Sequence, residues 1–537
     1  MGSGSEFAAT EIWSAADKET IMQLVADACA EAPDRLALVF EDGVALTRAD
    51  YMKRVERFSG YLSTKVEPDA RVAIMLPNRV EFLIAWIAVV ANRAILVSMN
   101  PALREHDAGH ILRDSGACLL IADEELRPML SGLQADCPDL RDVLYVGGEE
   151  PGGLDGYAGT HSASIKDSRS LRTDGVNVYY TSGTTGPPKG CLVNHEYWLR
   201  YVDLYLRLYG MNADDRILCC LQFYYNDPPW QFLTSLLVGS TLVAVRRFSV
   251  SRFWQVVRDY DVTQAFGIAS IPMLLLKADP GEAEQAHKVR FGMQVGMPPS
   301  IHRACVERWG FPWVEGYGLT ETGLVVSMPL DCAEEMTGSG SIGLACPEAV
   351  LRIADESDRE LPRGELGEIQ VATSTPGLMV GYLNAPEATA EMNRGGWVHT
   401  GDLGSMDEQG FLYFRGRSKD MVRRSGENVA APEVEEVLRL HPDILDAAVV
   451  PVPDDVRGEE VGAHVRLVPD ASPQTVPPEA IVKFCSERLA SFKVPRYIGY
   501  RSQDFPRTPS MRIRKDELRK EGDGRLSWWD RTDALGW

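Results

Sequence analysis

Residues 179–190, YYTSGTTGPPKG, combine glycines, hydroxyl side chains and one lysine directly after an apolar run. Glycine permits positive φ and a close backbone approach, so consecutive N–H groups can point at phosphate oxygens. The stretch is not a Walker A loop, because that loop places Gly-Lys-Ser/Thr at the start of a helix and two prolines precede Lys189 here. The alternative is an ordinary hydroxyl-rich turn. We favour a phosphate-binding loop.

The elements that must position this loop alternate between short apolar runs and helical patterns. The expected strands lie at 71–76, 94–99, 118–123, 143–146 and 176–180, and the expected helices at 81–92 and 195–210. Such alternation predicts a largely parallel sheet that is covered on both faces.

The pattern changes after residue 341. Glycine-punctuated short strands, such as 367–372 and 411–416, predict an antiparallel subdomain. After Lys419 we expect a smaller α+β unit, with helices at 432–441 and 477–492 and strands at 447–452 and 462–468. The polar tail at 523–537 contains three tryptophans, which we expect to pack back onto the body.

Composition limits the possible functions. A chain of 537 residues is too long for one core and predicts two or more domains. The net charge of −22 argues against a nucleic acid partner, so an anionic ligand must meet a local positive site. Residues 415–424 supply one, since they hold five cations against one carboxylate. A solvated cluster of charges at a helix end is the alternative there.

The cysteines and the apolar runs indicate a cytoplasmic protein without a membrane span. Ten cysteines occur without CxxC pairs, which is typical of reduced, buried thiols. The longest apolar run, 82–91, is about half of a membrane span and is read as a buried helix.

The loop at 179–190 closely resembles the phosphate loop of the adenylate-forming superfamily, which includes acyl-CoA synthetases, adenylation domains of peptide synthetases and luciferases. Further similar segments follow in the family's order at 98–123, 315–322, 367–371, 396–404, 416–435 and 508–519. NPALREHDAGHIL and WWDRTDALG look most similar to the crotonobetaine/carnitine-CoA ligase branch.

The resemblance implies an α/β fold with a large N-terminal domain and a small, mobile α+β C-terminal domain. The large domain would hold two parallel-type αβαβα subdomains and an antiparallel β subdomain. We expect it at 8–416, the hinge at 417–419 around Lys419, and the small domain at 420–537. Residues 1–7, MGSGSEF, resemble a cloning remnant and are excluded.

The resemblance also implies two half-reactions. A carboxylic acid first reacts with MgATP to give an acyl-adenylate and pyrophosphate. The small domain then rotates, and the thiol of coenzyme A displaces AMP to give a thioester.

Site residues are carried over from the matching motifs. The β- and γ-phosphates would be held by Lys189 with Thr181, Ser182, Gly183, Thr184, Thr185 and Gly186. Adenine and the α-phosphate would meet Gly296, Met297, Pro298, Gly316, Tyr317, Gly318, Leu319 and Thr320. Glu321 would bind Mg²⁺, a hard cation that prefers oxygen ligands. Asp402 would accept both ribose hydroxyls beside Arg417, and CoA would pass Arg423, Arg424, Ser425 and Gly426.

The acyl pocket departs from the family pattern. Tyr225 stands where most relatives have histidine. Tyr224, Asn226, Trp230 and Ala269 are further candidates for the pocket lining, and plain core packing is the alternative for each.

A second departure concerns catalysis. Relatives place Gly-Lys where this chain has Met511-Arg512, and their lysine stabilises charge during adenylation. Arginine keeps the charge but is planar and bulkier. We therefore expect adenylation to be impaired or lost while CoA thioesterification of acyl-AMP is retained.

An enzyme of this kind would take a preformed acyl-adenylate from a separate adenylating enzyme, as would suit natural-product biosynthesis, with a bulky diterpenoid acid as the expected acyl group. Three alternatives stay open at this point. The chain could be an ordinary ATP-dependent acyl-CoA synthetase in which Arg512 or Lys515 replaces the lysine, an adenylation enzyme for a carrier protein, or a non-catalytic acyl-adenylate binder. The sequence leaves the oligomeric state unknown.

Overall fold

The computed structural model describes residues 15, 17–147, 153–165, 170–181, 188–267, 271–424, 427–454, 456–507, 513–521 and 528–532. The chain divides into two compact units. The first comprises Met1–Leu351 and Val371–Val398, and the second Arg352–Gln370 and His399–Trp537. The predicted division at 417–419 stays a prediction.

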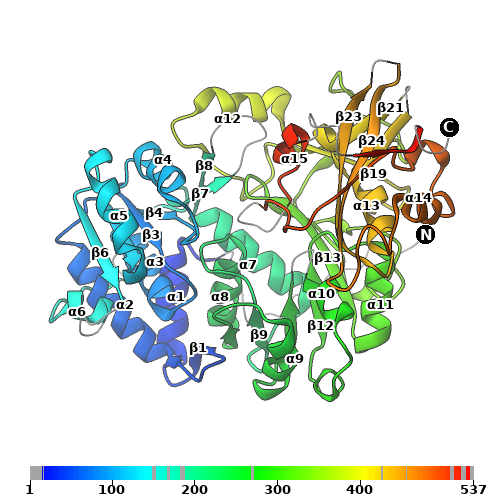
Figure 1. Cartoon of the computed structure of the whole chain (residues 1–537). Coiled ribbons are helices and arrows are strands. Elements are labelled where there is room, and N and C mark those ends of the chain that lie inside the picture. Colours follow the sequence, from blue (N-terminus) through cyan, green and yellow to red (C-terminus); the bar gives the residue numbers. More distant parts are fainter. Residues whose placement is uncertain are drawn as a thin grey trace. The chain divides into compact units, whose positions relative to one another are not determined.

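The first unit contains a seven-stranded sheet in the order β18-β8-β7-β4-β3-β5-β6. Its strands are β3 (Arg71–Met75), β4 (Ile95–Ser98), β5 (Leu119–Asp123), β6 (Asp142–Val146), β7 (Gly175–Thr181), β8 (Lys189–Asn194) and β18 (Gly381–Tyr382). Strands β3, β4, β6, β7 and β8 of this sheet are labelled in Figure 1. Neighbours from β7 to β6 are parallel, whereas β8 runs antiparallel to both β7 and β18. The five strands expected from the sequence are therefore confirmed.

Strands β3, β4 and β5 are almost entirely buried, and helices flank them along the chain. These helices are α1 (Ile21–Glu31), α2 (Arg48–Leu62), α3 (Val80–Ala91), α4 (Glu105–Ser115), α5 (Arg127–Leu133) and α6 (Leu154–Ala158). All residues of α3 are buried except Glu81 and Ala91, which confirms the buried helix expected at 82–91. Among the described residues, no helix combines the length and the apolar character that a membrane crossing requires.

The first unit also contains a nine-stranded sheet in the order β15-β14-β13-β12-β11-β9-β10-β1-β2. Its strands are β1 (Leu36–Phe40), β2 (Ala45–Thr47), β9 (Arg216–Cys219), β10 (Thr241–Ala244), β11 (Gln264–Phe266), β12 (Phe291–Gln294), β13 (Trp313–Leu319), β14 (Gly323–Ser327) and β15 (Leu344–Ala345). The later helices of this unit are α7 (His195–Tyr209), α8 (Asp227–Val238), α9 (Val250–Asp259), α10 (Ile271–Lys277), α11 (Pro299–Trp309) and α12 (Pro386–Met392). Neighbours from β1 to β13 are parallel, and β14 returns antiparallel after a tight turn.

His195 begins α7 and joins it to α1. Its Nδ1 accepts the N–H of Ile21 at 3.2 Å, and the side chain is almost fully buried. Burial lowers the pKa of His195 from 6.5 to about 4, because the charged imidazolium is poorly solvated there.

Replacing His195 should therefore reduce the loss of folding stability that occurs as the pH falls from about 7 to 4.5. The folded state binds fewer protons than the unfolded state between pH 6.5 and 4, so the stabilisation is complete above the unfolded pKa and is lost as pH falls through the folded pKa. The whole effect is about 3 kcal/mol at most. Thermal unfolding from about pH 7 to pH 4.5 should show a smaller decline for His195→Gln than for wild type. His106→Gln, at an exposed side chain, is the control, and equal declines in all three proteins would contradict the assignment.

The second unit contains two sheets. The four-stranded sheet has the order β16-β17-β19-β20, and the six-stranded sheet β22-β21-β24-β25-β26 with β23 paired to β24. The first consists of β16 (Leu351–Ala354), β17 (Gly367–Ala372), β19 (Trp397–Met406) and β20 (Leu412–Arg417). The second consists of β21 (Met421–Arg424), β22 (Glu427–Ala430), β23 (Ile444–Asp454), β24 (Gly458–Leu467), β25 (Tyr497–Tyr500) and β26 (Trp529–Asp530), with helices α13 (Ala431–Arg439), α14 (Pro478–Ser486) and α15 (Lys515–Glu521).

One helix of this unit is shorter than expected. The sequence predicted a helix at 477–492, but α14 ends at Ser486 and a 3₁₀ turn follows at Ser491–Lys493. Leu489 and Phe492 then pack against the core of this unit, which explains why the apolar pattern continues beyond the helix.

Two of the three tail tryptophans pack as expected, and the cysteines are free thiols as expected. Trp528 packs against His464 with a ring-centroid distance of 4.4 Å, and β26, which begins at Trp529, pairs with β25. Trp537 lies outside the described residues. All ten cysteines are free thiols, and nine of them are buried.

Candidate functional site

Two residues of the predicted phosphate loop face each other across the β7–β8 hairpin. Thr181 ends β7, Lys189 begins β8, and the two are register partners. The other predicted phosphate ligands, Ser182, Gly183, Thr184, Thr185 and Gly186, lie outside the described residues, so their roles stay predictions.

The turn between β13 and β14 presents Thr320 and Glu321. Leu319 N–H donates to Thr322 Oγ1 at 2.9 Å, and Thr322 N–H donates to Leu319 O at 3.1 Å. Gly318 is required here, because a Cβ would lie 1.9 Å from a backbone oxygen of the returning strand. A rigid strand-to-strand turn therefore supports the predicted carboxylate.

Glu321 accepts hydroxyls from two strands of the other sheet. Its Oε1 receives Tyr382 OH at 2.8 Å and lies 3.4 Å from Thr181 Oγ1. The Nζ of Lys189 lies 5.4 Å from the centre of the Tyr382 ring. The structure thus brings Thr181, Lys189 and Glu321 together around Tyr382. Sequence reasoning missed Tyr382, since its partners are far away along the chain.

These groups fit Mg²⁺. Both hydroxyls converge on Oε1 of Glu321, and within the described part of the chain its Oε2 has no hydrogen-bond or ion-pair partner. Carboxylate and hydroxyl oxygens are the ligands this hard cation prefers.

A buried glutamate shapes the predicted adenine site. Glu315 accepts the N–H groups of Gly296 at 3.0 Å and Met297 at 2.8 Å. This ties the loop that includes Pro298 to the strand that carries Gly316 and Tyr317, and Tyr317 is itself buried. Burial raises the pKa of Glu315 to about 8, although the two N–H donors lower it. Sequence reasoning missed Glu315 as well.

The predicted ribose pair lies in the second unit. Asp402 on β19 and Arg417 on β20 are cross-strand partners, and Arg417 Nε lies 3.0 Å from Asp402 Oδ1. Asp402 is 2% exposed, so the ion pair fixes a buried carboxylate. The structure brings these two predicted residues together.

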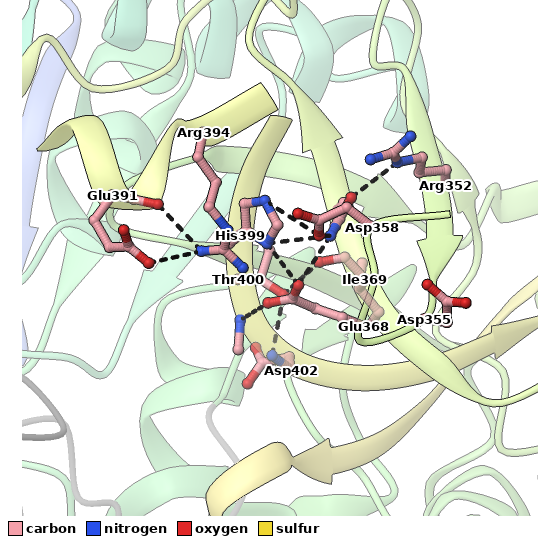
Figure 2. Close-up of polar contacts among 12 residues, drawn as sticks. Arg352, Asp355, Asp358, Glu368, Ile369, Glu391, Arg394, His399, Thr400 and Asp402 are labelled. Atoms are coloured by element: carbon pink, nitrogen blue, oxygen red, sulfur yellow. Dashed lines mark hydrogen bonds and ion pairs between the residues drawn. The ribbon is translucent and has the colours of Figure 1, made fainter. Parts of the chain in front are cut away.

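A polar network supports the turn before Asp402 (Figure 2). Glu368 Oε1 accepts the Gly401 N–H at 2.9 Å, and its Oε2 lies 2.7 Å from His399 Nδ1. Asp358, Glu368 and His399 form a possible metal cluster. The Nε2 of Gln370 lies 3.0 Å from Asp358 Oδ1, 2.9 Å from Glu368 Oε2 and 3.1 Å from His399 Nδ1. An amide nitrogen therefore occupies the place of a cation, and we assign no metal there.

Two family patterns match the chain that carries these residues. The pattern of AMP-binding enzymes matches residues 25–383, and that of the AMP-binding enzyme C-terminal domain matches 433–512. The chain belongs to the AMP-binding enzyme family. The match covers both the phosphate hairpin and the turn that carries Glu321.

Related sequences and structures agree with this assignment. The crotonobetaine/carnitine–CoA ligase of Escherichia coli O7:K1 is 32% identical over 464 residues, which cover 84% of this chain and 88% of that protein. ATP-bound MatB from Rhodopseudomonas palustris has a TM-score of 0.84 at 25% identity, with 94% and 99% of the two chains covered. The o-succinylbenzoate CoA synthetase MenE of Bacillus subtilis, in complex with the acyl-adenylate OSB-AMP, has a TM-score of 0.80 at 26% identity, with 92% and 97% covered.

This member of the AMP-binding enzymes is an acid–thiol ligase, and it has the large N-terminal and smaller C-terminal domains of that fold. Acyl-CoA formation through an acyl-adenylate, from an acid, ATP and CoA, is the reaction of this family.

The predicted acyl-pocket residues of this AMP-binding enzyme differ in setting. The rings of Tyr224 and Tyr225 lie 4.6 Å apart, and Asn226 Nδ2 donates to Tyr197 OH at 3.4 Å. Trp230 is 1% exposed and packs against Tyr205 with a ring-centroid distance of 4.4 Å, and its role in an acyl pocket stays a prediction. Ala269 lies outside the described residues.

A cavity of about 720 Å³ lies elsewhere in the first unit. Its lining includes Trp254, Arg258, Leu275, Asp279 and Arg308, and none of the predicted pocket residues. Arg308 already binds the buried carboxylate of Glu284 at 3.1 Å, so its charge is compensated.

The predicted hinge and CoA residues lie in the second unit. The carbonyl of Lys419 accepts from Arg519 at 2.8 Å, and burial lowers the pKa of the Lys419 ammonium. Arg424 Nε binds the buried Glu460 at 2.6 Å, whereas Arg423 is 66% exposed. Ser425 and Gly426 lie outside the described residues.

The substituted catalytic segment falls partly outside the described residues, since Met511 and Arg512 are not among them. Lys515, the other candidate cation, lies on α15, and its Nζ binds Glu435 Oε1 on α13 at 2.6 Å. Both side chains are mostly buried, at 12% and 7% exposure. Glu435 also accepts the Val449 N–H at 2.7 Å, so Lys515 belongs to a structural network.

Proposed function

We propose that this AMP-binding enzyme forms acyl-CoA from a preformed acyl-adenylate and is poor at making that adenylate from acid and ATP. The thiol sulfur of CoA would attack the acyl carbonyl carbon, the bond from that carbon to the phosphate oxygen would break, AMP would leave, and the thiol proton would pass to solvent.

The ion pair of Lys515 carries the proposal. A lysine that is mostly buried against Glu435 would have to leave a partially desolvated partner to reach a phosphate. Breaking this buried contact costs free energy, although Arg439, 3.5 Å from Glu435 Oε2, would keep the carboxylate paired. Lys515 is therefore a poor substitute for the cation that relatives use in adenylation.

Arg512 is the remaining substitute at the expected position. Its guanidinium spreads the charge over a planar fork, whereas lysine places a compact charge at one point. Met511 replaces glycine, which would narrow the approach of the segment. A mispositioned cation loses most of its stabilisation of the transition state, which is worth about 10²–10³ in rate.

The chain's other residues would still hold the acyl-adenylate. Asp402 would accept the ribose hydroxyls, and Glu315 would hold the loop beside adenine. Lys189 would neutralise phosphate charge, and Glu321 would bind Mg²⁺, which screens the phosphates of ATP during adenylation.

One observation favours the ordinary two-step ligase as a second candidate. Lys189 and Glu321, which serve the phosphates and Mg²⁺ in the first half-reaction, keep a defined arrangement around Tyr382. The comparison of the two half-reactions decides between these candidates.

The test measures both half-reactions on one preparation. We expect thioester formation from synthetic acyl-AMP and CoA to proceed while ATP–pyrophosphate exchange stays weak across a panel of acids. Lys515→Met should lower thermal stability and leave the residual exchange unchanged, because Lys515 serves structure. Robust exchange in the wild-type enzyme would refute the proposal, and exchange that disappears in Lys515→Met would identify Lys515 as the replacement cation.

The proposal extends to the source of the acyl-adenylate, the kind of acid and the cellular compartment. We propose that a separate adenylating enzyme supplies the acyl-adenylate, that the acid is a bulky natural product such as a diterpenoid acid, and that the enzyme works in the cytoplasm, where its free thiols stay reduced. A panel of synthetic acyl-AMPs of increasing bulk tests the acyl preference.

A further inference from the structure

Tyr382 contacts two predicted site residues through different parts of its side chain. Its hydroxyl donates to Oε1 of Glu321 at 2.8 Å, and its ring centre lies 5.4 Å from the Nζ of Lys189. A cation within about 6 Å of an aromatic face is attracted by the ring quadrupole. One side chain therefore acts on both the carboxylate and the ammonium.

The backbone fixes the position of Tyr382. Its strand, β18, pairs antiparallel with β8, where Tyr382 is the register partner of Cys191. The Tyr382 N–H donates to Thr389 Oγ1 at 2.9 Å, and the Leu383 N–H donates to Gly190 O at 2.7 Å. The ring is thus anchored to the strand that begins with Lys189.

The same segment also holds the turn that carries Glu321. The Met379 N–H donates to the Glu321 carbonyl at 2.9 Å. Since the backbone and Oε1 of Glu321 are both held, the carboxylate has one orientation, and among the described residues no partner competes for Oε2.

We propose that Tyr382 is a positioning residue of the nucleotide site. Its hydroxyl holds Oε1 of Glu321, so that Oε2 would be left to bind Mg²⁺, and its ring holds the Lys189 ammonium, which would neutralise phosphate charge. The inference rests on the magnesium role proposed above for Glu321, and it holds whether or not adenylation is impaired, because it concerns binding of MgATP.

Two variants separate the two contacts. Tyr382→Phe removes the hydroxyl and keeps the ring, so the Mg²⁺ concentration needed for half-maximal ATP binding should rise about tenfold, while the Kd for ATP at saturating Mg²⁺ changes less than about twofold. Tyr382→Leu also removes the ring, so this Kd should rise about three- to tenfold in addition. Isothermal titration of the full-length protein with ATP over a Mg²⁺ series measures both quantities.

Tyr413→Phe is the matched control, because it removes another tyrosine–carboxylate hydrogen bond, to Asp407 at 3.1 Å, outside the site. It should bind ATP like wild type at every Mg²⁺ concentration. A wild-type Mg²⁺ profile for Tyr382→Phe would overturn the proposal even if Tyr382→Leu were unstable, since the phenylalanine variant loses one atom only. Equal losses at low and saturating Mg²⁺ would also overturn it. ATP–pyrophosphate exchange tests the proposed impairment of adenylation in a separate experiment, so a failure of one proposal can be distinguished from a failure of the other.

Discussion

Replacing Met511 by glycine and Arg512 by lysine together is expected to raise ATP–pyrophosphate exchange by about 10²–10³. Lysine restores a compact point charge that can follow the developing charge at phosphorus, and glycine reopens the approach of the segment. The rate of thioester formation from synthetic acyl-AMP should change less than about threefold, because the segment serves the other half-reaction.

Three further variants sharpen this experiment. The single changes Met511→Gly and Arg512→Lys should each raise ATP–pyrophosphate exchange less than the double change. The compact charge of lysine and the open approach that glycine allows both serve the adenylation step. Arg514→Lys is the matched control, because Arg514 binds Glu517 at 2.6 Å on the same segment. If the double variant exchanged pyrophosphate no faster than the wild-type enzyme, residues 511 and 512 would not limit adenylation.

Asp402→Asn should raise the KM for acyl-AMP about 100-fold in thioester formation, because the carboxylate would accept two ribose hydroxyls and hydrogen bonds to a charged acceptor contribute about 1.5–3 kcal/mol each. The variant also removes the negative charge that lies 3.0 Å from Arg417 at a site where Asp402 is 2% exposed. Steady-state kinetics with acyl-AMP and direct titration with AMP should give the same fold-change.

Glu408→Gln serves as the control for this variant. It makes the same charge change on the same β19–β20 hairpin, at an exposed residue, and should leave the KM unaltered. If Asp402→Asn lowered only the melting temperature while AMP affinity stayed constant, the ribose role of Asp402 would be wrong.

The fold was predictable wherever local pattern and burial agree. Strands β3 to β5 each contain a run of apolar residues that is buried in the fold. Their positions could therefore be predicted from where apolar residues follow one another along the chain. The end of α14 could not be predicted in the same way. Turn residues that pack on the same core as a helix, as Leu489 and Phe492 do, extend its apolar periodicity beyond its last turn.

The candidate site was predictable only in part. Lys189, Glu321, Asp402 and Arg417 stand in unusual local motifs. The structure brings Lys189 and Glu321 to the same tyrosine, Tyr382, and places Arg417 beside Asp402, while the roles of all four residues stay predictions. Tyr382 could not be found this way, because its role depends on contacts with residues that are distant along the chain, and Glu321 is 61 positions away.

The roles of Glu315 and Lys515 also depend on contacts that only the folded chain shows. Glu315 stands in the motif at 315–322, yet only the folded chain shows that it holds the backbone of Gly296 and Met297. Lys515 looked like a free cation in the sequence, and its partner Glu435 lies far earlier in the chain, on another helix.

The short strand β26 has a consequence for any shortened form of the enzyme. It covers one side of β25, and Asp530 binds Arg496 at 3.1 Å. A chain cut before Trp528 would expose the backbone edge of β25 and leave the guanidinium of Arg496 short of a partner. Unprotected strand edges are templates for pairing between molecules. Loss of these few residues would therefore promote self-association before it altered the chemistry of the site.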